Sequence, residues 1–125
     1  MEVVSYEISK KLKEKGFNTE FKYSLGYYDT LGNFMSAADH WFLDSWIIAP
    51  TISQVLKWLR EEKEIDIVIY PIDGNTVFMG GEKYILSVYI NKKRDYKLHH
   101  DNIDKYVKWE QAALAGIEYV IDNLI

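Results

Sequence analysis

Hydrophobic and polar positions change their period once within residues 49–71, which predicts a helix that passes directly into a strand. The apolar positions of the first half recur at helical spacing: Ile52, Val55, Leu56 and Leu59. Isoleucines then alternate with other residues over 65–70, the period of a strand. Thr51 and Gln54 have the spacing of a capping box, so the helix is predicted to begin at Thr51. Pro71 has no N–H, so the strand should weaken there or turn that position outward.

The same two periods predict the remaining elements. Helices are expected over 2–15 and from about 104–108 to the C-terminus, and strands over 20–28, 40–48 and 83–91. Gly16 suits the left-handed position that ends the first helix, with Phe17 packing on Leu12. Two segments lie between these elements. Residues 29–38 should be a connection, and residues 76–82 fit either a strand extension or a loop.

These elements predict an α+β fold in the order α-β-β-α-β-β-α. We expect one four-stranded, largely antiparallel or mixed sheet, with the helices packed mainly on one of its faces. The last helix carries an apolar stripe, and the small residues Ala113 and Gly116 within it allow that helix to approach the sheet closely. A chain of 125 residues is long enough for one domain with a core, so residues 1–125 are predicted to be a single domain.

Composition excludes several kinds of site. The chain has no cysteine, which rules out disulfides, thiolate nucleophiles and cysteine-ligated metals. Its N-terminus lacks the pattern of a signal peptide, and no apolar run approaches the roughly 20 residues needed to cross a bilayer. We therefore expect a cytoplasmic protein with no membrane partner and no cofactor. The net charge of −4 argues against broad nucleic-acid binding.

Two segments carry a resemblance to a known family. They are LKWLRE at 56–61, which leads into the alternating strand, and WEQAALAGI at 109–117 in the last helix. In both, the chain resembles a family of small uncharacterised bacterial proteins associated with prophages and other mobile elements of gut bacteria. It departs from the usual pattern at Trp109, where Tyr is common, and at Gln111, where an acid is common. The resemblance implies bacterial or phage origin and a shared fold, and it supplies no mechanism.

Residues 92–108 are the one basic stretch, with six Lys or Arg against three Asp. An anion or nucleic-acid patch here would use cations for phosphate and Tyr96 for stacking on a base. Its candidate residues are Lys92, Lys93, Arg94, Tyr96 and Lys97. The alternative is an ordinary charged connection, since short runs of mixed charge often only solvate a surface.

Three neighbouring residues, His99, His100 and Asp101, are candidate ligands for a divalent metal. An exposed polar loop is the favoured alternative, because adjacent residues of a strand point to opposite faces and cannot both face one metal ion. Asp39, His40 and Asp44 invite a general acid–base interpretation, but the sequence shows no nucleophile or phosphate-binding loop to join them. No catalytic residue is therefore assigned.

Aromatic residues exceed what a small core needs, with ten Tyr and four Trp. Tyr and Trp are favoured at protein interfaces, and they also complete the margins of a core. The candidate interaction residues are Trp58, Arg60, Trp46, Tyr70 and Tyr89. The leading hypothesis is a non-enzymatic protein-interaction module, as a homodimer or with another protein. The alternatives are a nucleic-acid-binding accessory protein that uses residues 92–108, and a small metal-dependent enzyme centred on His99 and His100.

Overall fold

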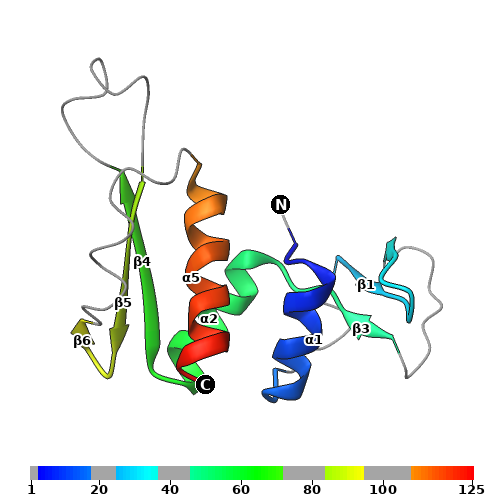
Figure 1. Cartoon of the computed structure of the whole chain (residues 1–125), viewed down its shortest axis with the longest axis horizontal. Coiled ribbons are helices and arrows are strands. Elements are labelled where there is room, and N and C mark those ends of the chain that lie inside the picture. The colour runs from blue at the N-terminus through cyan, green and yellow to red at the C-terminus, as the bar shows by residue number, and fades with distance from the viewer. Residues whose placement is uncertain (1–2, 18–24, 37–45, 72–83, 95–107) are drawn as a thin grey trace. The chain divides into compact units, whose positions relative to one another are not determined.

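The computed structural model describes residues 3–17, 25–36, 46–71, 84–94 and 108–125 (Figure 1). The chain forms two compact units, which we call unit 1 (residues 1–55 with Ile125) and unit 2 (residues 56–124). The described residues contain helices together with antiparallel strands, which confirms the α+β class. Among them, no helix combines the length and the hydrophobicity that crossing a membrane requires. The single domain over 1–125 stays a prediction.

Unit 1 contains one complete helix and a small sheet. Its elements are α1 (Tyr6–Glu14), β1 (Gly26–Tyr28), β2 (Phe34–Ser36) and β3 (Ile47–Ile48). The strands form an antiparallel sheet in the order β2-β1-β3. The Ser5 hydroxyl accepts from the backbone N–H of Ile8 at 3.3 Å, so α1 begins later than the predicted residue 2. At its other end Gly16 has a φ of 91° and the Phe17 N–H donates to the carbonyl of Leu12, which confirms the predicted termination.

The helix α2 (Ile52–Glu62) has the capping box that the sequence predicts. The N–H of Thr51 donates to Oε1 of Gln54 at 2.9 Å, and the N–H of Gln54 donates to Oγ1 of Thr51 at 3.2 Å. The two bonds thereby satisfy donors at the start of the helix, where the first N–H groups have no partner within the helix itself.

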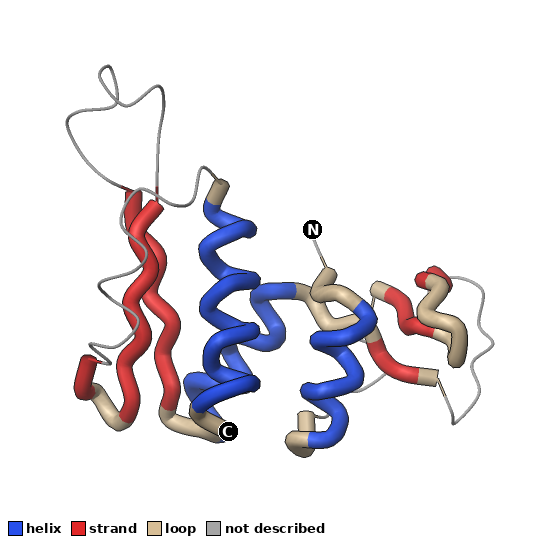
Figure 2. Tube along the Cα trace, in the orientation of Figure 1, coloured by secondary structure: helices blue, strands red, loops and turns tan. Residues whose placement is uncertain are grey.

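Unit 2 is built on two long strands, β4 (Ile65–Pro71) and β5 (Tyr84–Ile90), with β6 (Lys93–Arg94) at one edge. They form an antiparallel sheet in the order β4-β5-β6. Figure 2 shows β4 and β5 side by side, with α5 (Trp109–Asn123) running along them. α5 packs on the sheet face that carries Ile67 and Leu86. Its own buried positions are Ala112, Ala113, Gly116, Ile117, Val120 and Ile121, which confirms the apolar stripe predicted for the last helix.

β4 is an edge strand of this sheet within the described residues. The N–H of Asn91 donates to the carbonyl of Glu64 at 3.0 Å, which fixes the alternation of the ladder. In antiparallel pairs, hydrogen-bonded and non-hydrogen-bonded positions alternate along the strand. The backbone groups of residues 66, 68 and 70 therefore point toward β5, and those of 65, 67, 69 and 71 point away from it. The backbone nitrogen of Pro71 therefore points away from β5. This is the second of the two outcomes that the sequence predicted for Pro71, namely an outward-facing position instead of a weakened strand.

The described strands form two three-stranded sheets instead of the single four-stranded sheet that the sequence predicts. Each half of the chain contains one strand more than expected. β2 lies inside the predicted connection 29–38, because a tight hairpin pairs it with β1. β6 lies inside the basic stretch, because the turn at Asn91 and Lys92 folds it back on β5. Residues 76–82, and most of the strands predicted over 20–28 and 40–48, lie outside the described residues.

Candidate functional site

A cavity of ≈ 680 Å³ opens on the sheet face of unit 2 that α5 does not cover. We call it the sheet pocket, and its lining residues come from the end of α2, from β4, and from β5 with its following turn: Arg60, Glu64, Asp66, Val68, Tyr89, Asn91 and Lys92. Side chains of a strand alternate between faces, so Asp66 and Val68 point away from the side on which Ile67 contacts α5. Tyr89 pairs with Asp66 across the two strands and shares that face.

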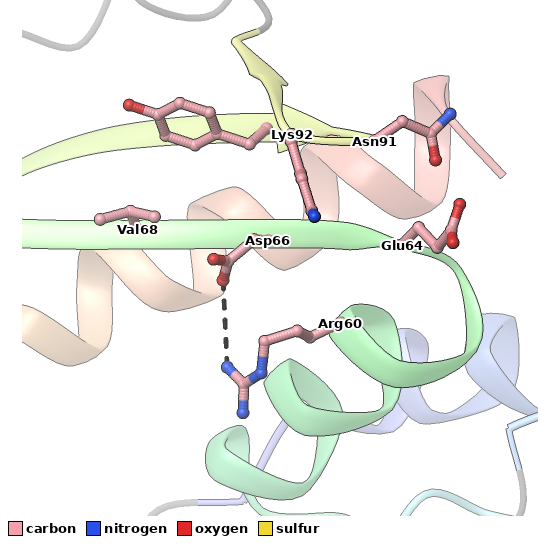
Figure 3. A pocket seen from close by; sticks show the side chains of 7 residues that line it. Arg60, Glu64, Asp66, Val68, Asn91 and Lys92 are labelled. Atoms are coloured by element: carbon pink, nitrogen blue, oxygen red, sulfur yellow. Dashed lines mark ion pairs between the residues drawn. The ribbon is translucent and has the colours of Figure 1, made fainter.

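Charges of both signs surround this pocket. Nη1 of Arg60 lies 3.9 Å from Oδ1 of Asp66, with the side chains 55% and 48% exposed. Figure 3 shows Arg60 and Lys92 reaching toward Asp66 from opposite sides of β4. Within the described residues, Lys92 has no ion-pair partner within 4.0 Å. The carboxylates of Glu64 and Asp66 balance the cations of Arg60 and Lys92, so the lining has a formal charge near zero. Half-buried Val68 and Tyr89 supply its apolar surface.

Unusual backbone conformations gather at the same pocket. Glu64, Asn91 and Lys92 have φ angles of 55°, 49° and 68°, and they are the non-glycine residues with positive φ in the described part of the chain. All three line the pocket. The left-handed region costs most residues about 1–2 kcal/mol. Such conformations concentrate at functional sites, and here they fix the direction of two charged side chains.

The structure brings two of the five predicted interaction residues, Arg60 and Tyr89, together in the sheet pocket. Tyr70 lies on the same sheet face, where its hydroxyl is 2.8 Å from Oγ of Ser87. Trp58 is half-buried on α2, with Nζ of Lys63 5.4 Å from the centre of its ring. Trp46 belongs to unit 1, where it packs on Tyr27 with ring centres 5.1 Å apart.

The predicted anion-binding residues are described only in part. Lys92 lines the sheet pocket, and Lys93 is exposed in β6. Arg94 is the β6 residue in register with Tyr89. Tyr96 and Lys97 lie outside the described residues.

The metal and acid–base candidates lie outside the described residues as well. These are His99, His100 and Asp101, together with Asp39, His40 and Asp44. In the part of the chain that the structure describes, no group of three or more His, Cys, Asp or Glu residues is placed to hold a metal ion.

A second surface, which the sequence did not predict, lies on the β1–β2 hairpin of unit 1. We call it the hairpin surface, and it consists of Leu25, Leu31 and Phe34, which are 44%, 84% and 47% exposed. They are the large hydrophobic residues with substantial exposure in the described regions. Leu31 stands near the tip of the hairpin. In the sequence, the pair Gly32-Asn33 favours a tight turn in this loop, but it does not predict which side chains the turn exposes.

Hydrogen bonds to one carboxylate organise the tip of this hairpin. Oδ1 of Asp29 accepts from the N–H groups of Leu31 and Asn33, both at 2.9 Å. The Asn33 backbone N–H, helped by the other hydrogen bonds of this loop, holds the pKa of the Asp29 carboxyl below its usual range. Gly32 has a φ of 84°, and the ring of Tyr6 would lie 3.1 Å from a Cβ at that position. The loop therefore has a defined shape and presents Leu31 from it.

Comparisons with protein-family models, with curated proteins and with solved structures give no match for this chain.

Proposed function

We propose that this chain is a non-enzymatic protein-interaction module that binds its partner at the sheet pocket, with a second copy of the chain as the first partner to test. The observation that carries the proposal is the gathering of all described left-handed non-glycine residues around one cavity. Backbone strain of this kind persists where the surrounding structure imposes it, and it is concentrated at functional sites. Here the positioned residues are Glu64 and Lys92, beside Tyr89.

The character of the pocket favours a protein partner. Tyr and Arg are enriched among residues that dominate binding energies at interfaces, and the pocket contains Tyr89 and Arg60. Two cations beside two carboxylates suit a protein surface, which itself carries both signs. A polyphosphate ligand would meet the cations of the pocket but would be repelled by Glu64 and Asp66. Nucleic-acid binding through residues 92–108 is therefore the lesser proposal.

Sedimentation of the purified chain over a range of concentrations tests this function. We expect self-association in the micromolar range, because interfaces of standard size normally remain formed there. Lys92→Glu should weaken the association, since it reverses the charge that reaches over the pocket. Lys93→Glu makes the same charge change at an exposed neighbour that does not line the pocket, and it should associate like the unaltered chain.

A chain that stays monomeric at tens of micromolar would rule out the homodimer. Binding to a short single-stranded oligonucleotide, weakening with salt, would instead favour the nucleic-acid proposal. The resemblance of residues 56–61 and 109–117 supports, as a further part of the proposal, an origin in bacterial mobile elements. A cytoplasmic location belongs to the same proposal, and the lack of cysteine agrees with it.

A further inference from the structure

The hairpin surface has the properties of a preformed docking element. Leu31 is 84% exposed, and two backbone hydrogen bonds to Asp29 hold the loop that carries it. Phe34 packs edge-to-face on the buried Tyr28, with ring centres 5.8 Å apart, so its position is also supported from beneath. A loop that is ordered before binding loses little conformational entropy when a partner covers it. Large apolar side chains that an ordered loop holds in solvent, as here with Leu31 and Phe34, are available to a partner.

The chemistry of this surface defines the recess that would receive it. Residues 25–36 contain one charge, the carboxylate of Asp29, and no Lys or Arg. A suitable recess therefore has an apolar floor for Leu31 and a cation at its rim. The sheet pocket offers both, with half-buried Val68 and Tyr89 as apolar surface and Lys92 as a cation. Arg60 offsets the nearby charge of Asp66, so the carboxylate of Asp29 meets less repulsion there.

We infer that the hairpin surface of one copy docks into the sheet pocket of a second copy, with Leu31 on Val68 and Tyr89 and with Asp29 beside Lys92. This inference rests on the interaction function proposed above and names its partner. A contact between two hairpin surfaces is disfavoured, because it would bring the Asp29 carboxylates of both copies together without a cation from either hairpin. The contact thus joins two different surfaces, and a homodimer that uses it twice pairs the hairpin of each copy with the pocket of the other.

Mixing two complementary variants tests a contact between two different surfaces directly. Leu31→Gln removes the apolar tip and keeps the pocket, whereas Lys92→Glu alters the pocket and keeps the hairpin. By sedimentation, each variant alone should associate about tenfold more weakly than the unaltered chain, or worse. An equimolar mixture should form a 1:1 complex, because the hairpin of the Lys92→Glu chain still finds an intact pocket on the Leu31→Gln chain.

Controls and outcomes separate this inference from the proposed function. Thr30→Gln changes an exposed neighbour of Leu31 in the same loop and should associate normally, and circular dichroism of every variant confirms that it folds. If Lys92→Glu weakens association but Leu31→Gln does not, the interaction function stands and the inference is wrong. If both variants weaken association and their mixture does not recover it, the contact joins like surfaces, and the inference is again wrong. A monomeric unaltered chain overturns both the inference and the homodimer.

Discussion

Gly116 of α5 lies so close to Ile67 of β4 that a Cβ on the glycine would stand 2.8 Å from the Cγ2 atom of the isoleucine. Such a Cβ would also lie 2.9 Å from Cδ1 of Leu86. Both distances are shorter than a carbon–carbon contact, so one of these packed side chains would have to move. The glycine therefore sets the separation between helix and sheet in unit 2, as its position in the predicted apolar stripe suggested.

Replacing this glycine by alanine should destabilise the protein. Gly116→Ala gains ~1 kcal/mol of helix propensity but overpacks the contact with Ile67 and Leu86, which typically costs ~1–3 kcal/mol. We expect a net loss of about 1 kcal/mol in the free energy of unfolding, measured with urea. Ala115→Gly, at a half-buried position in the same turn, gives the size of the propensity effect together with the loss of one methyl group. A Gly116→Ala protein that is more stable than the unaltered chain would show that the sheet yields to the helix.

The capping box of α2 should contribute measurable stability. Thr51→Ala removes the hydroxyl that accepts from the N–H of Gln54, and losses of this kind cost ~0.5–2 kcal/mol. Thr51→Ser keeps the hydroxyl and should retain most of that stability. Urea unfolding of both variants is the measurement. Equal losses for Ala and Ser would mean that burial of the Thr51 methyl group, and not the cap, matters at this position.

The buried Tyr28 should make stability depend on alkaline pH. Its hydroxyl donates to the carbonyl of Val4 at 2.6 Å, and burial raises the pKa of Tyr28 above the ordinary 10.0. Its contribution is complete below the pKa of the unfolded chain and is lost as the pH rises through the raised pKa of the folded state. Tyr28→Phe should lose ~1 kcal/mol near neutral pH by removing the hydrogen bond.

Comparing the unaltered chain with Tyr28→Phe separates the ionisation of Tyr28 from that of the other tyrosines. Above pH 10 the difference in unfolding free energy between the unaltered chain and Tyr28→Phe should shrink, because only the former still carries the ionising group. A difference that stays constant with pH would contradict the assignment.

Protonation of Asp29 at acid pH should weaken the hydrogen bonds that hold the hairpin tip. Because hydrogen bonds lower its pKa, its contribution is present above the pKa of an unfolded aspartate and disappears as the pH falls through the lowered folded value. In NMR spectra we expect the amide signals of Leu31 and Asn33 to change only below the usual aspartate range. The Asp29→Asn chain should lack this transition. A transition at the ordinary aspartate pKa would show that these hydrogen bonds do not form in solution.

Replacing Lys92 by glycine should make the folded chain more stable and its self-association weaker. Lys92→Gly relieves a φ of 68° and should stabilise the folded chain by ~0.5–1 kcal/mol, while it removes the cation over the sheet pocket and weakens self-association. Urea unfolding and sedimentation of the same sample measure the two effects. Loss of stability in the glycine variant would mean that the side chain of Lys92 stabilises the fold itself.

Local features were accessible from the sequence because they depend on neighbouring residues. The capping box at Thr51, the helix end at Gly16 and the alternation of β4 each need only a few adjacent positions, and each is confirmed. The close approach at Gly116 also followed from the stripe of small residues in α5.

The additional strands β2 and β6, the sheet pocket and the hairpin surface depend on strand pairing and turn conformations that join residues distant in the sequence. β2 and β6 are three and two residues long, too short to show a period of two. Glu64 and Lys92 have no side-chain preference for the left-handed region, so nothing in the sequence marked the turns that bring them to the sheet pocket. The sequence named Arg60, Tyr89 and Lys92 for two different functions, and only the pairing of β4 with β5 shows that they share one cavity.

The outward position of Pro71 has a consequence for solubility. Among the described residues, no strand pairs with the outer edge of β4, and an unpaired edge of a seven-residue strand rich in isoleucine is a template on which further strands can add, the first step toward aggregation. Along this edge the donors belong to Ile65, Ile67 and Ile69, and the next outward position is a proline, which offers none. An incoming chain therefore finds a short row of donors that stops at Pro71. The proline acts as a gatekeeper, and a residue with an N–H in its place would extend the row on which fibrils grow.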